Sequence, residues 1–182
     1  MKKFLTVILA FVCALGISVG LISCKEKEKK LQIGEEYFYA GISFKKAKGI
    51  TLDDISSFVP SSVTGHKIDS VKDFENLLKE NIDTYFIERR TENGRERIPL
   101  KTSILSVKIT EGNPYVAHAY TLWISCENQE NPYQVPALRD GDTFTIADSL
   151  SSFPDFYYAD GAIHYDLQFN EKFSVVYNYK LK

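Results

Sequence analysis

The sequence predicts an α+β fold in which antiparallel strands outnumber helices. The first observation is that apolar and polar residues alternate along much of the second half of the chain, as they do in half-buried strands. The second is one clear amphipathic helix, at residues 70–80. The third is the composition, because 44% hydrophobic and 25% charged residues are typical of a packed domain rather than a disordered one.

The predicted helix has recognisable ends. Ser70 precedes it and is placed to cap it, and Asp73 follows three residues later in an acidic variant of the capping box. Asn81 marks its end. One face of the helix is apolar and carries Val71, Phe74, Leu77 and Leu78.

A hairpin is predicted after the helix. Residues 84–91 and 95–101 have strand patterns and are joined by Glu92-Asn93-Gly94, and Asn-Gly tolerates the positive φ angles of a tight turn. Pro99 lacks a backbone N–H, which places the second strand at a sheet edge.

The remainder of the chain, residues 103–182, is predicted to be antiparallel β structure. Two alternating runs are separated by Gly112-Asn113-Pro114: the first carries Leu105, Val107 and Ile109, and the second Val116, His118, Tyr120, Leu122, Ile124 and Cys126. Residues 156–158, 163–169 and 173–181 then form a three-stranded meander with turns at Asp160-Gly161 and Asn170-Glu171-Lys172. These patterns predict a β-sandwich or β-meander region with one buried face.

The first 24 residues have the layout of an export signal. Lys2 and Lys3 precede an apolar stretch, residues 4–22, which ends in Leu21-Ile22-Ser23-Cys24. This ending resembles the bacterial lipobox. The resemblance implies that the Cys24 thiol receives a diacylglycerol, that the chain is cleaved before Cys24, and that the new amino group is acylated as well.

An uncleaved membrane helix is the alternative interpretation of this leader, because a span needs about 20 apolar residues. Both interpretations place residues 25–182 outside the cytoplasm by the positive-inside rule. We therefore expect the folded part in the cell envelope, in the periplasm or at the cell surface. Apart from the covalent lipid on Cys24, no cofactor is expected.

Four segments are predicted along the chain. They are a signal peptide at 1–23, the lipidated cysteine with a flexible tether at 24–34, an α+β region at 35–102 and the antiparallel β region at 103–182. The tether, Lys25–Gly34, has mixed charge and no apolar periodicity, and ten flexible residues span about 17 to 19 Å.

The order of elements in the α+β region resembles a bacterial PDZ domain over residues 39–102. The residues that carry the resemblance are Val63–Ser70, Asp73-Phe74, Leu77-Leu78, Phe86–Arg89 through Gly94, and Ile98–Leu100. Upstream, Gly41-Ile42-Ser43-Phe44 is similar to the loop that binds a peptide carboxylate. The resemblance implies that an extended peptide adds a strand beside Ile42–Lys46 and sends its carboxylate to amides near Gly41 and Ile42. Alternatively, this region is an ordinary helix packed on a hairpin, and Gly41 merely permits a turn.

The net charge and the cysteine content argue against a nucleic-acid partner and against an internal disulfide. The net charge is −2, and loss of Lys2 and Lys3 leaves the mature chain near −4. Without a basic patch, this charge argues against a nucleic-acid partner. Cys126 has no partner once Cys13 leaves with the leader and Cys24 is lipidated, so no internal disulfide is expected.

No catalytic or metal-binding residue is predicted. His66, His118 and His164 lack the short spacing of a local metal site, and His118 is expected to be a hydrogen-bonded residue of the core or its rim. Arg139-Asp140-Gly141-Asp142 lacks the further ligands of a calcium loop and is predicted to be a polar turn. Cys126 lies on an apolar strand, where a thiol is inert.

Two segments rich in aromatic residues are the last candidate for a binding surface. Tyr37-Phe38-Tyr39 and residues 153–158 either fill a β core, which we prefer, or form a sugar-binding or protein-binding surface.

Three functions follow from these observations. The first is a lipid-anchored, non-catalytic binding or scaffold module with a protein or peptide partner. The second is a structural or surface-antigen lipoprotein without a ligand cleft. The third is an envelope hydrolase, which would need a deep cleft that gathers Asp, His and Ser from separate strands.

Overall fold

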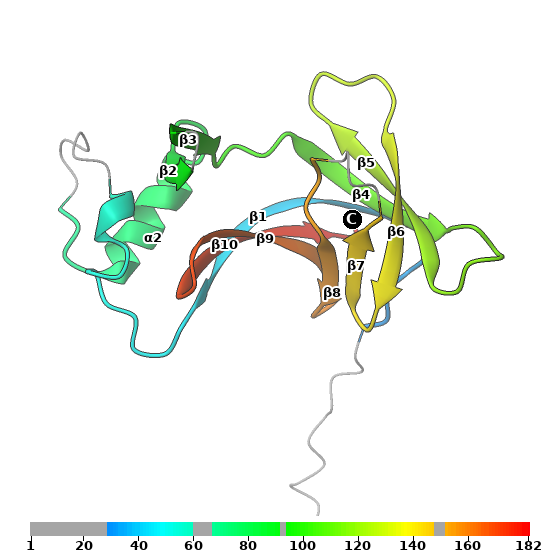
Figure 1. The fold of residues 1–182 in the computed structure, drawn as a ribbon, viewed down its shortest axis with the longest axis horizontal. Coiled ribbons are helices and arrows are strands. Elements are labelled where there is room, and N and C mark those ends of the chain that lie inside the picture. The colour runs from blue at the N-terminus through cyan, green and yellow to red at the C-terminus, as the bar shows by residue number, and fades with distance from the viewer. Residues whose placement is uncertain (1–28, 60–66, 92–93, 148–151) are drawn as a thin grey trace, which may run out of the picture.

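The computed structural model describes residues 29–59, 67–91, 94–147 and 152–182. The predicted signal peptide, Cys24 and His66 lie outside these ranges. Eight antiparallel strands close into a barrel in the order β1-β10-β9-β8-β7-β6-β5-β4 (Figure 1). They are β1 (Glu36–Lys46), β4 (Ile104–Glu111), β5 (Ala119–Cys126), β6 (Tyr133–Asp140), β7 (Thr143–Ile146), β8 (Phe156–Ala159), β9 (Ala162–Asn170) and β10 (Phe173–Lys180).

The barrel has a simple connectivity with one exception. Strands β4 to β10 follow one another around the barrel, each pairing with the next, and they include the predicted meander at β8, β9 and β10. β1 lies between the last strand, β10, and the earlier strand β4, and so closes the barrel. The predicted α+β fold with mostly antiparallel strands is therefore confirmed.

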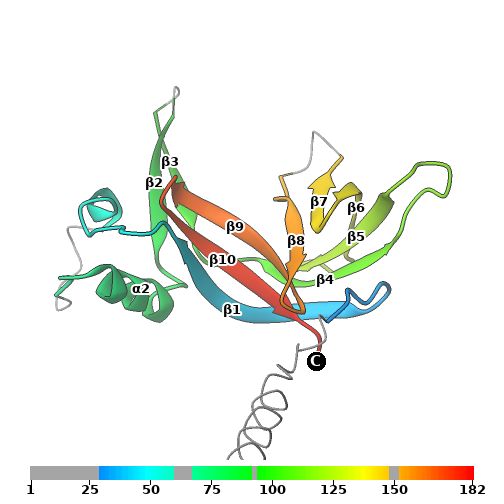
Figure 2. The same cartoon turned by 90° about the horizontal axis from the view of Figure 1, so that it is seen from below.

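The chain makes a long excursion between β1 and β4. It contains the short 3-10 helix η1 (Ser56–Phe58), the helix α2 (Val71–Glu80) and a separate hairpin of β2 (Phe86–Thr91) and β3 (Gly94–Pro99). These elements lie at the end of β1, β9 and β10 that is far from the other barrel strands (Figure 2).

The predicted helix and hairpin are both confirmed. Ser70 caps α2, since its hydroxyl oxygen accepts a hydrogen bond from the Asp73 N–H at 3.2 Å. Leu77 and Leu78 on the apolar face are buried. In the hairpin, Ile87 pairs with Ile98.

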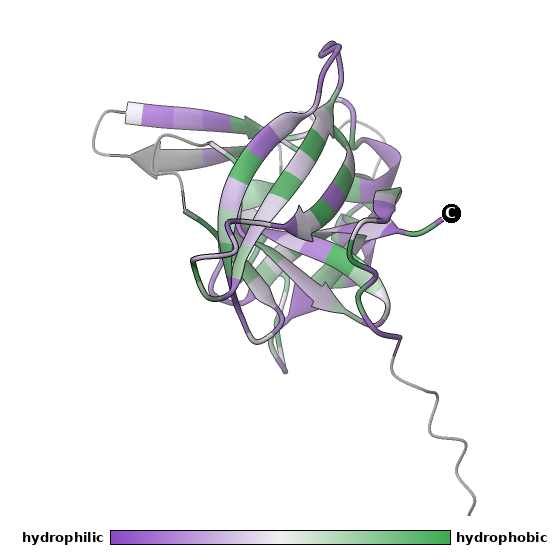
Figure 3. Ribbon diagram, turned by 90° about the vertical axis from the view of Figure 1, so that its right-hand side faces the viewer, coloured by the Kyte–Doolittle hydropathy of each residue, from purple (hydrophilic) through white to green (hydrophobic). Residues whose placement is uncertain are grey.

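Alternation along the strands fills the barrel with side chains. In β10, Phe173, Val175, Tyr177 and Tyr179 are buried and alternate with Ser174, Val176 and Asn178, of which only Val176 is buried as well. Figure 3 shows the same alternation as hydrophobic and hydrophilic bands along the barrel strands. Rings from other strands complete the interior, as is usual for an eight-stranded barrel. The aromatic residues at Tyr37, Phe144 and Phe156 are fully buried, which confirms that these rings belong to the core.

Buried tyrosine hydroxyls tie the excursion to the barrel. The Tyr177 hydroxyl donates to the Leu100 carbonyl at 2.5 Å, and the Tyr165 hydroxyl lies 3.0 Å from the Thr102 Oγ1. Both partners belong to the segment that joins β3 to β4. Burial raises the pKa of Tyr165 to about 12, so these phenols are neutral, hydrogen-bonded core groups.

The finer fold expectations are not confirmed. The predicted sandwich would consist of two packed sheets, whereas β1 and β4 to β10 form one closed barrel. The predicted PDZ-like region would be a unit of its own, whereas β1 pairs with β10 and β4 of the barrel. Periodicity gives the faces of strands but not their partners, and the partner of β1 lies at the other end of the chain.

Two strand details differ from the sequence pattern. Leu105 is 48% exposed, because an irregularity in the β4–β5 pairing between Ile104 and Ser106 turns Leu105 away from the face of Val107. Residues 112–118 form a connection rather than the start of a strand. His118 is exposed there, with φ of 59°, so it is not a residue of the core.

The described part of the predicted tether, residues 29–34, lies against the barrel. The Tyr158 hydroxyl donates to the Lys29 carbonyl at 2.6 Å. The Gln32 N–H donates to the Tyr37 hydroxyl, and the Gly34 N–H donates to the Ile109 carbonyl at 2.8 Å. Within the described ranges, no helix combines the length and apolar character needed to cross a membrane.

Candidate functional site

The candidate site is an edge of β1. One edge of this strand pairs with β10 from Phe38 to Lys46, with an irregularity between Tyr39 and Ile42. The opposite edge pairs with β4 only from Glu36 to Phe38. Beyond Phe38, no other strand in the described ranges pairs with this second edge, which we call the open edge of β1.

Hydrogen bonding shows which residues face the open edge. Lys46 of β1 is paired with Phe173 of β10. The Ala47 N–H, one residue after Lys46, donates to the carbonyl of Lys172, one residue before Phe173, at 2.9 Å. In an antiparallel ladder, such a bond identifies Lys46 and Phe173 as a non-hydrogen-bonded pair, and these pairs alternate with hydrogen-bonded ones. The backbone groups of Ile42, Phe44 and Lys46 therefore point to the open edge, and those of Ser43 and Lys45 point to β10.

The inner side of this segment is apolar. Phe44 stacks on Phe173 with ring centroids 5.6 Å apart, and Ile42 is partly buried against the core. The Lys79 ammonium of α2 lies 5.4 Å from the centroid of the Phe44 ring. A strand added here would therefore find an apolar surface on one of its faces.

The outer side is polar and ordered. The Lys45 Nζ lies 2.7 Å from Asp166 Oδ2, and the Tyr157 hydroxyl donates to the other carboxylate oxygen at 2.8 Å. The same ammonium lies 4.2 Å from the centroid of the Tyr157 ring. Partial burial by itself would lower the pKa of Lys45. Hydrogen bonds to Asp166 and Tyr157 have a larger, opposite effect, so the pKa of Lys45 is raised overall. The lysine is therefore held as a fixed positive charge.

The polar network continues around Asn178 of β10. Its Nδ2 donates to the Gly41 carbonyl at 3.0 Å, and its Oδ1 lies 2.8 Å from His164 Nδ1. The His164 ring stacks on Tyr157 with centroids 5.1 Å apart. These contacts hold the backbone at Gly41, whose φ of 98° marks the irregularity in β1.

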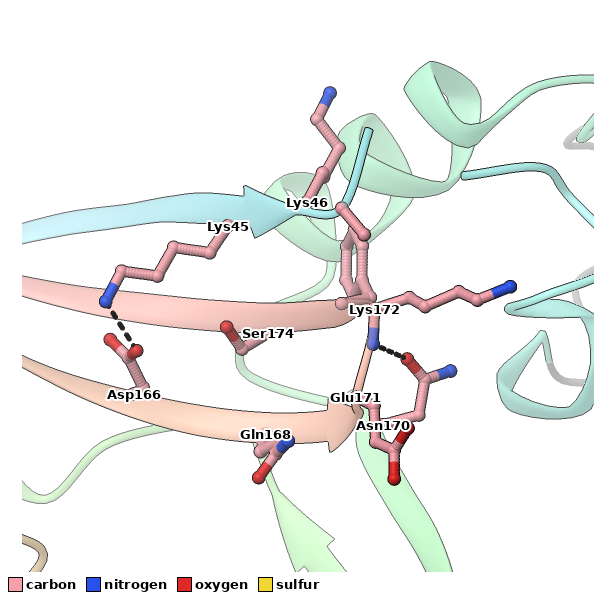
Figure 4. Close-up of a pocket in the computed structure, with 10 residues that line it drawn as sticks. Lys45, Lys46, Asp166, Gln168, Asn170, Glu171, Lys172 and Ser174 are labelled. Carbon is pink, nitrogen blue, oxygen red and sulfur yellow. Dashed lines mark hydrogen bonds and ion pairs between the residues drawn. The ribbon is translucent and has the colours of Figure 1, made fainter. Parts of the chain in front are cut away.

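A shallow hollow of about 390 Å³ lies on this outer face, where β9 turns into β10. In Figure 4 the Lys45 side chain points to Asp166, while Lys46 points to the other side of the sheet. The hollow has a mixed polar lining that includes Gln168, Lys172 and Ser174. Lys172 is engaged elsewhere, because its Nζ lies 2.6 Å from Asp54 Oδ1.

The residues predicted to capture a carboxylate, Gly41, Ile42, Ser43 and Phe44, lie inside β1 rather than in a loop before it. They are brought together with Lys45 and Asn178, which sequence reasoning missed. Asp166 lies in β9, within the predicted meander, but its partners Lys45 and Tyr157 come from other strands. No local pattern in the sequence indicates this cluster.

The other candidates are separate from the open edge. Cys126 is buried, and this burial raises the pKa of its thiol, as expected for an inert cysteine. Asp140 ends β6, and Gly141 and Asp142 form the turn to β7, which confirms the predicted turn. In the described part of the chain, His, Cys, Asp and Glu do not gather in groups of three or more that could hold a metal ion.

Comparisons of the chain with protein-family models, with curated proteins and with solved structures found no match.

Proposed function

We propose that this protein is a lipoprotein of a bacterial cell envelope, anchored by lipid on Cys24, that binds an extended peptide along the open edge of β1 without catalysing a reaction. The anchor is supported by Lys2, Lys3, the apolar stretch and the ending Leu21-Ile22-Ser23-Cys24. The folded part would lie outside the cytoplasm, in the periplasm or at the cell surface.

The observation that carries the binding function is the open edge itself. Ile42, Phe44 and Lys46 direct their backbone N–H and C=O groups to a side where no other strand in the described ranges pairs with them. Unpaired strand edges are templates for an added strand. Strand addition supplies affinity through main-chain hydrogen bonds, and pockets for alternate side chains supply specificity.

The side chains at the open edge define the peptide. Ile42 and Phe44 present an apolar face, and Ser43 and Lys45 present a polar face with a positive charge. An added strand places successive side chains on opposite faces. The fitting peptide therefore alternates apolar residues with polar or acidic ones.

The proposal also concerns the C-terminal carboxylate of the peptide. The resemblance to PDZ domains puts a terminal carboxylate near Gly41 and Ile42, and the Ile42 N–H is among the groups assigned to the open edge. The Gly41 carbonyl, which would repel a carboxylate, accepts a hydrogen bond from Asn178. An N–H donor beside an irregular strand suits a single negative charge.

Amide hydrogen exchange, measured by NMR on the full chain in detergent micelles, tests this function. The probes are ten-residue peptides that alternate valine and glutamate, with free or amidated C-termini. Saturating free-acid peptide should slow exchange at Ile42, Phe44 and Lys46 by at least about tenfold, because binding adds a hydrogen-bonded strand. The amides of Ser43 and Lys45 already face β10 and serve as internal controls.

Two variants sharpen the test. Lys45→Gln should weaken binding several-fold, whereas Lys48→Gln, an exposed lysine just beyond β1, should leave it unchanged. The amidated peptide should bind more weakly than the free acid. If no peptide slows exchange at the three edge amides of the folded, lipidated protein, peptide binding is wrong, and the anchored barrel fits the structural or surface-antigen alternative.

A further inference from the structure

The start of the described chain and three of the connections between strands lie at the same end of the barrel. Because neighbouring strands run antiparallel, β1 begins and β10 ends at the same end where β4–β5, β6–β7 and β8–β9 are joined. We call this the anchor end, and it comprises residues 29–35, 112–118, 141–142, 160–161 and 181–182. The Lys46 end of β1, with its open edge, lies at the opposite end.

Residues 29–34 are held against the barrel at the anchor end. Besides the hydrogen bonds to Lys29 and Gly34, the Lys29 side chain passes over Gly161, where a Cβ would meet the Lys29 Cδ at 2.7 Å. Only four residues, 25–28, then separate this contact from Cys24. Fully extended, four residues reach about 14 Å. A lipid on Cys24 would therefore hold the anchor end close to the bilayer surface.

An apolar loop projects from this end. In the connection between β4 and β5, Tyr115 is 95% exposed and Val116 is 47% exposed. Leu138, which pairs with Ala119 at the base of the loop, is 47% exposed. Single exposed apolar residues are normal on a protein surface, but Ile33 and Leu181 at this end are also exposed, at 40% and 41%, so exposed apolar side chains are concentrated here.

Local hydrogen bonds order this loop. The Asn113 side chain accepts from the Tyr115 N–H at 3.0 Å, and the Asn113 carbonyl accepts from the Val116 N–H at 3.0 Å. The Arg139 N–H donates to the His118 carbonyl at 2.9 Å and joins the loop to β6. The apolar side chains are therefore presented by a structured turn.

We propose that the loop at residues 112–118 is a membrane contact in which Tyr115 and Val116 lie in the headgroup layer of the bilayer that holds the anchor. This inference rests on the lipid anchor of the proposed function. A lipid surface is the favoured occupant because the four-residue tether keeps this end beside it, and tyrosine suits an interface with one apolar and one wet side. The anchor end carries three acidic residues, Glu35, Asp142 and Asp160, and three basic ones, Lys29, Lys30 and Lys182, so its charges balance and the contact is apolar rather than electrostatic.

Tryptophan fluorescence of the full lipidated chain in phosphatidylcholine vesicles tests the contact. The variants are Tyr115→Trp at the anchor end and Tyr133→Trp at the opposite end, where Tyr133 is 43% exposed. Both exchange one aromatic ring for another, and the wild-type signal from Trp123 is subtracted. Lipids brominated in the acyl chain should quench Tyr115→Trp about twofold and leave Tyr133→Trp unchanged, at low and high salt alike.

Flotation and the mass of lipid on Cys24 are measured in the same samples. Lipidated, floating protein with no quenching of Tyr115→Trp would overturn the loop contact and leave the anchor standing. Equal quenching of both variants would also overturn it, because the barrel would then have no fixed orientation. Protein that is neither lipidated nor floating would overturn the anchor, and the loop contact with it.

Discussion

Tyr165 and Tyr177 lie face to face inside the barrel, with ring centroids 4.5 Å apart and ring planes 9° from parallel. They belong to the paired strands β9 and β10, and their hydroxyls contact Thr102 and Leu100 of the segment between β3 and β4. One stacked pair therefore connects the barrel wall to the excursion.

Removal of the Tyr177 hydroxyl should destabilise the protein. Tyr177→Phe leaves the buried Leu100 carbonyl without its donor, which should lower the free energy of unfolding by about 1–2 kcal/mol. Urea denaturation measures this change. Tyr115→Phe at the exposed loop is the matched control and should stay within about 0.5 kcal/mol of wild type. Equal effects for both variants would contradict the role of the Tyr177 hydrogen bond.

Alkali should unfold the protein over a defined pH range. Burial raises the pKa of Tyr165 from 10.0 in the unfolded chain to about 12 in the folded one, and it raises the pKa of Tyr177 in the same direction. The unfolded state then loses protons that the folded state keeps, so stability is full below pH 10 and falls as the pH rises from 10 to 12. The slope is about 1.4 kcal/mol per pH unit for each such tyrosine.

Tyrosinate absorbance and circular dichroism measure this transition together. The buried tyrosines should ionise in the same step that removes the β signal. Ionisation of all tyrosines near pH 10, with the β signal intact, would contradict their burial.

Removal of one partner from the ion pair between β1 and α2 should destabilise the protein. The Lys46 Nζ lies 2.5 Å from Oε1 of Glu75, whose side chain is 5% exposed, and Lys72 lies 3.4 Å from the other oxygen. Lys46→Met leaves a buried carboxylate with only an exposed partner, which should cost about 1–3 kcal/mol in unfolding free energy.

A double-mutant cycle by urea denaturation isolates this pair. The double variant Lys46→Met, Glu75→Leu should recover most of the lost stability, because no unpaired charge stays buried. Lys48→Met is the control for loss of a nearby exposed lysine. Additive losses in the double variant would show that the pair is not coupled.

Gly41 should be needed for its backbone conformation. Its φ is 98°, and a Cβ built on it meets nothing within 4 Å. Gly41→Ala should therefore cost about 1–2 kcal/mol through the left-handed backbone alone, without a steric clash. Ala40→Ser, on the exposed neighbouring residue, should change the urea midpoint little. A Gly41→Ala midpoint equal to wild type would contradict this requirement.

Local elements were predictable from the sequence. Ser70 and Asp73 indicated the start of α2, Asn93-Gly94 indicated the hairpin, and alternation identified the strands of the meander. In each case, residues close in sequence determine the structure.

Long-range arrangements were not predictable. Barrel closure depends on β1 pairing with β10, and no local pattern links Ile42 to Tyr177. The irregularity before Ser106 reverses the face of Leu105, although the residue types alone favour its burial. The cluster of Lys45, Tyr157 and Asp166 draws on three strands, so only their pairing brings these side chains together.

The pairing of β1 with β10 also bears on how the chain matures. Ile42 to Lys46 find their strand partner only in Phe173 to Tyr177, so the ring of strands cannot close on the ribosome before Tyr177 has been synthesised. Contacts this distant in sequence form slowly, since a long loop must close first. The barrel of a nascent chain therefore stays open until β10 has been made, which is compatible with the export that we propose for this protein.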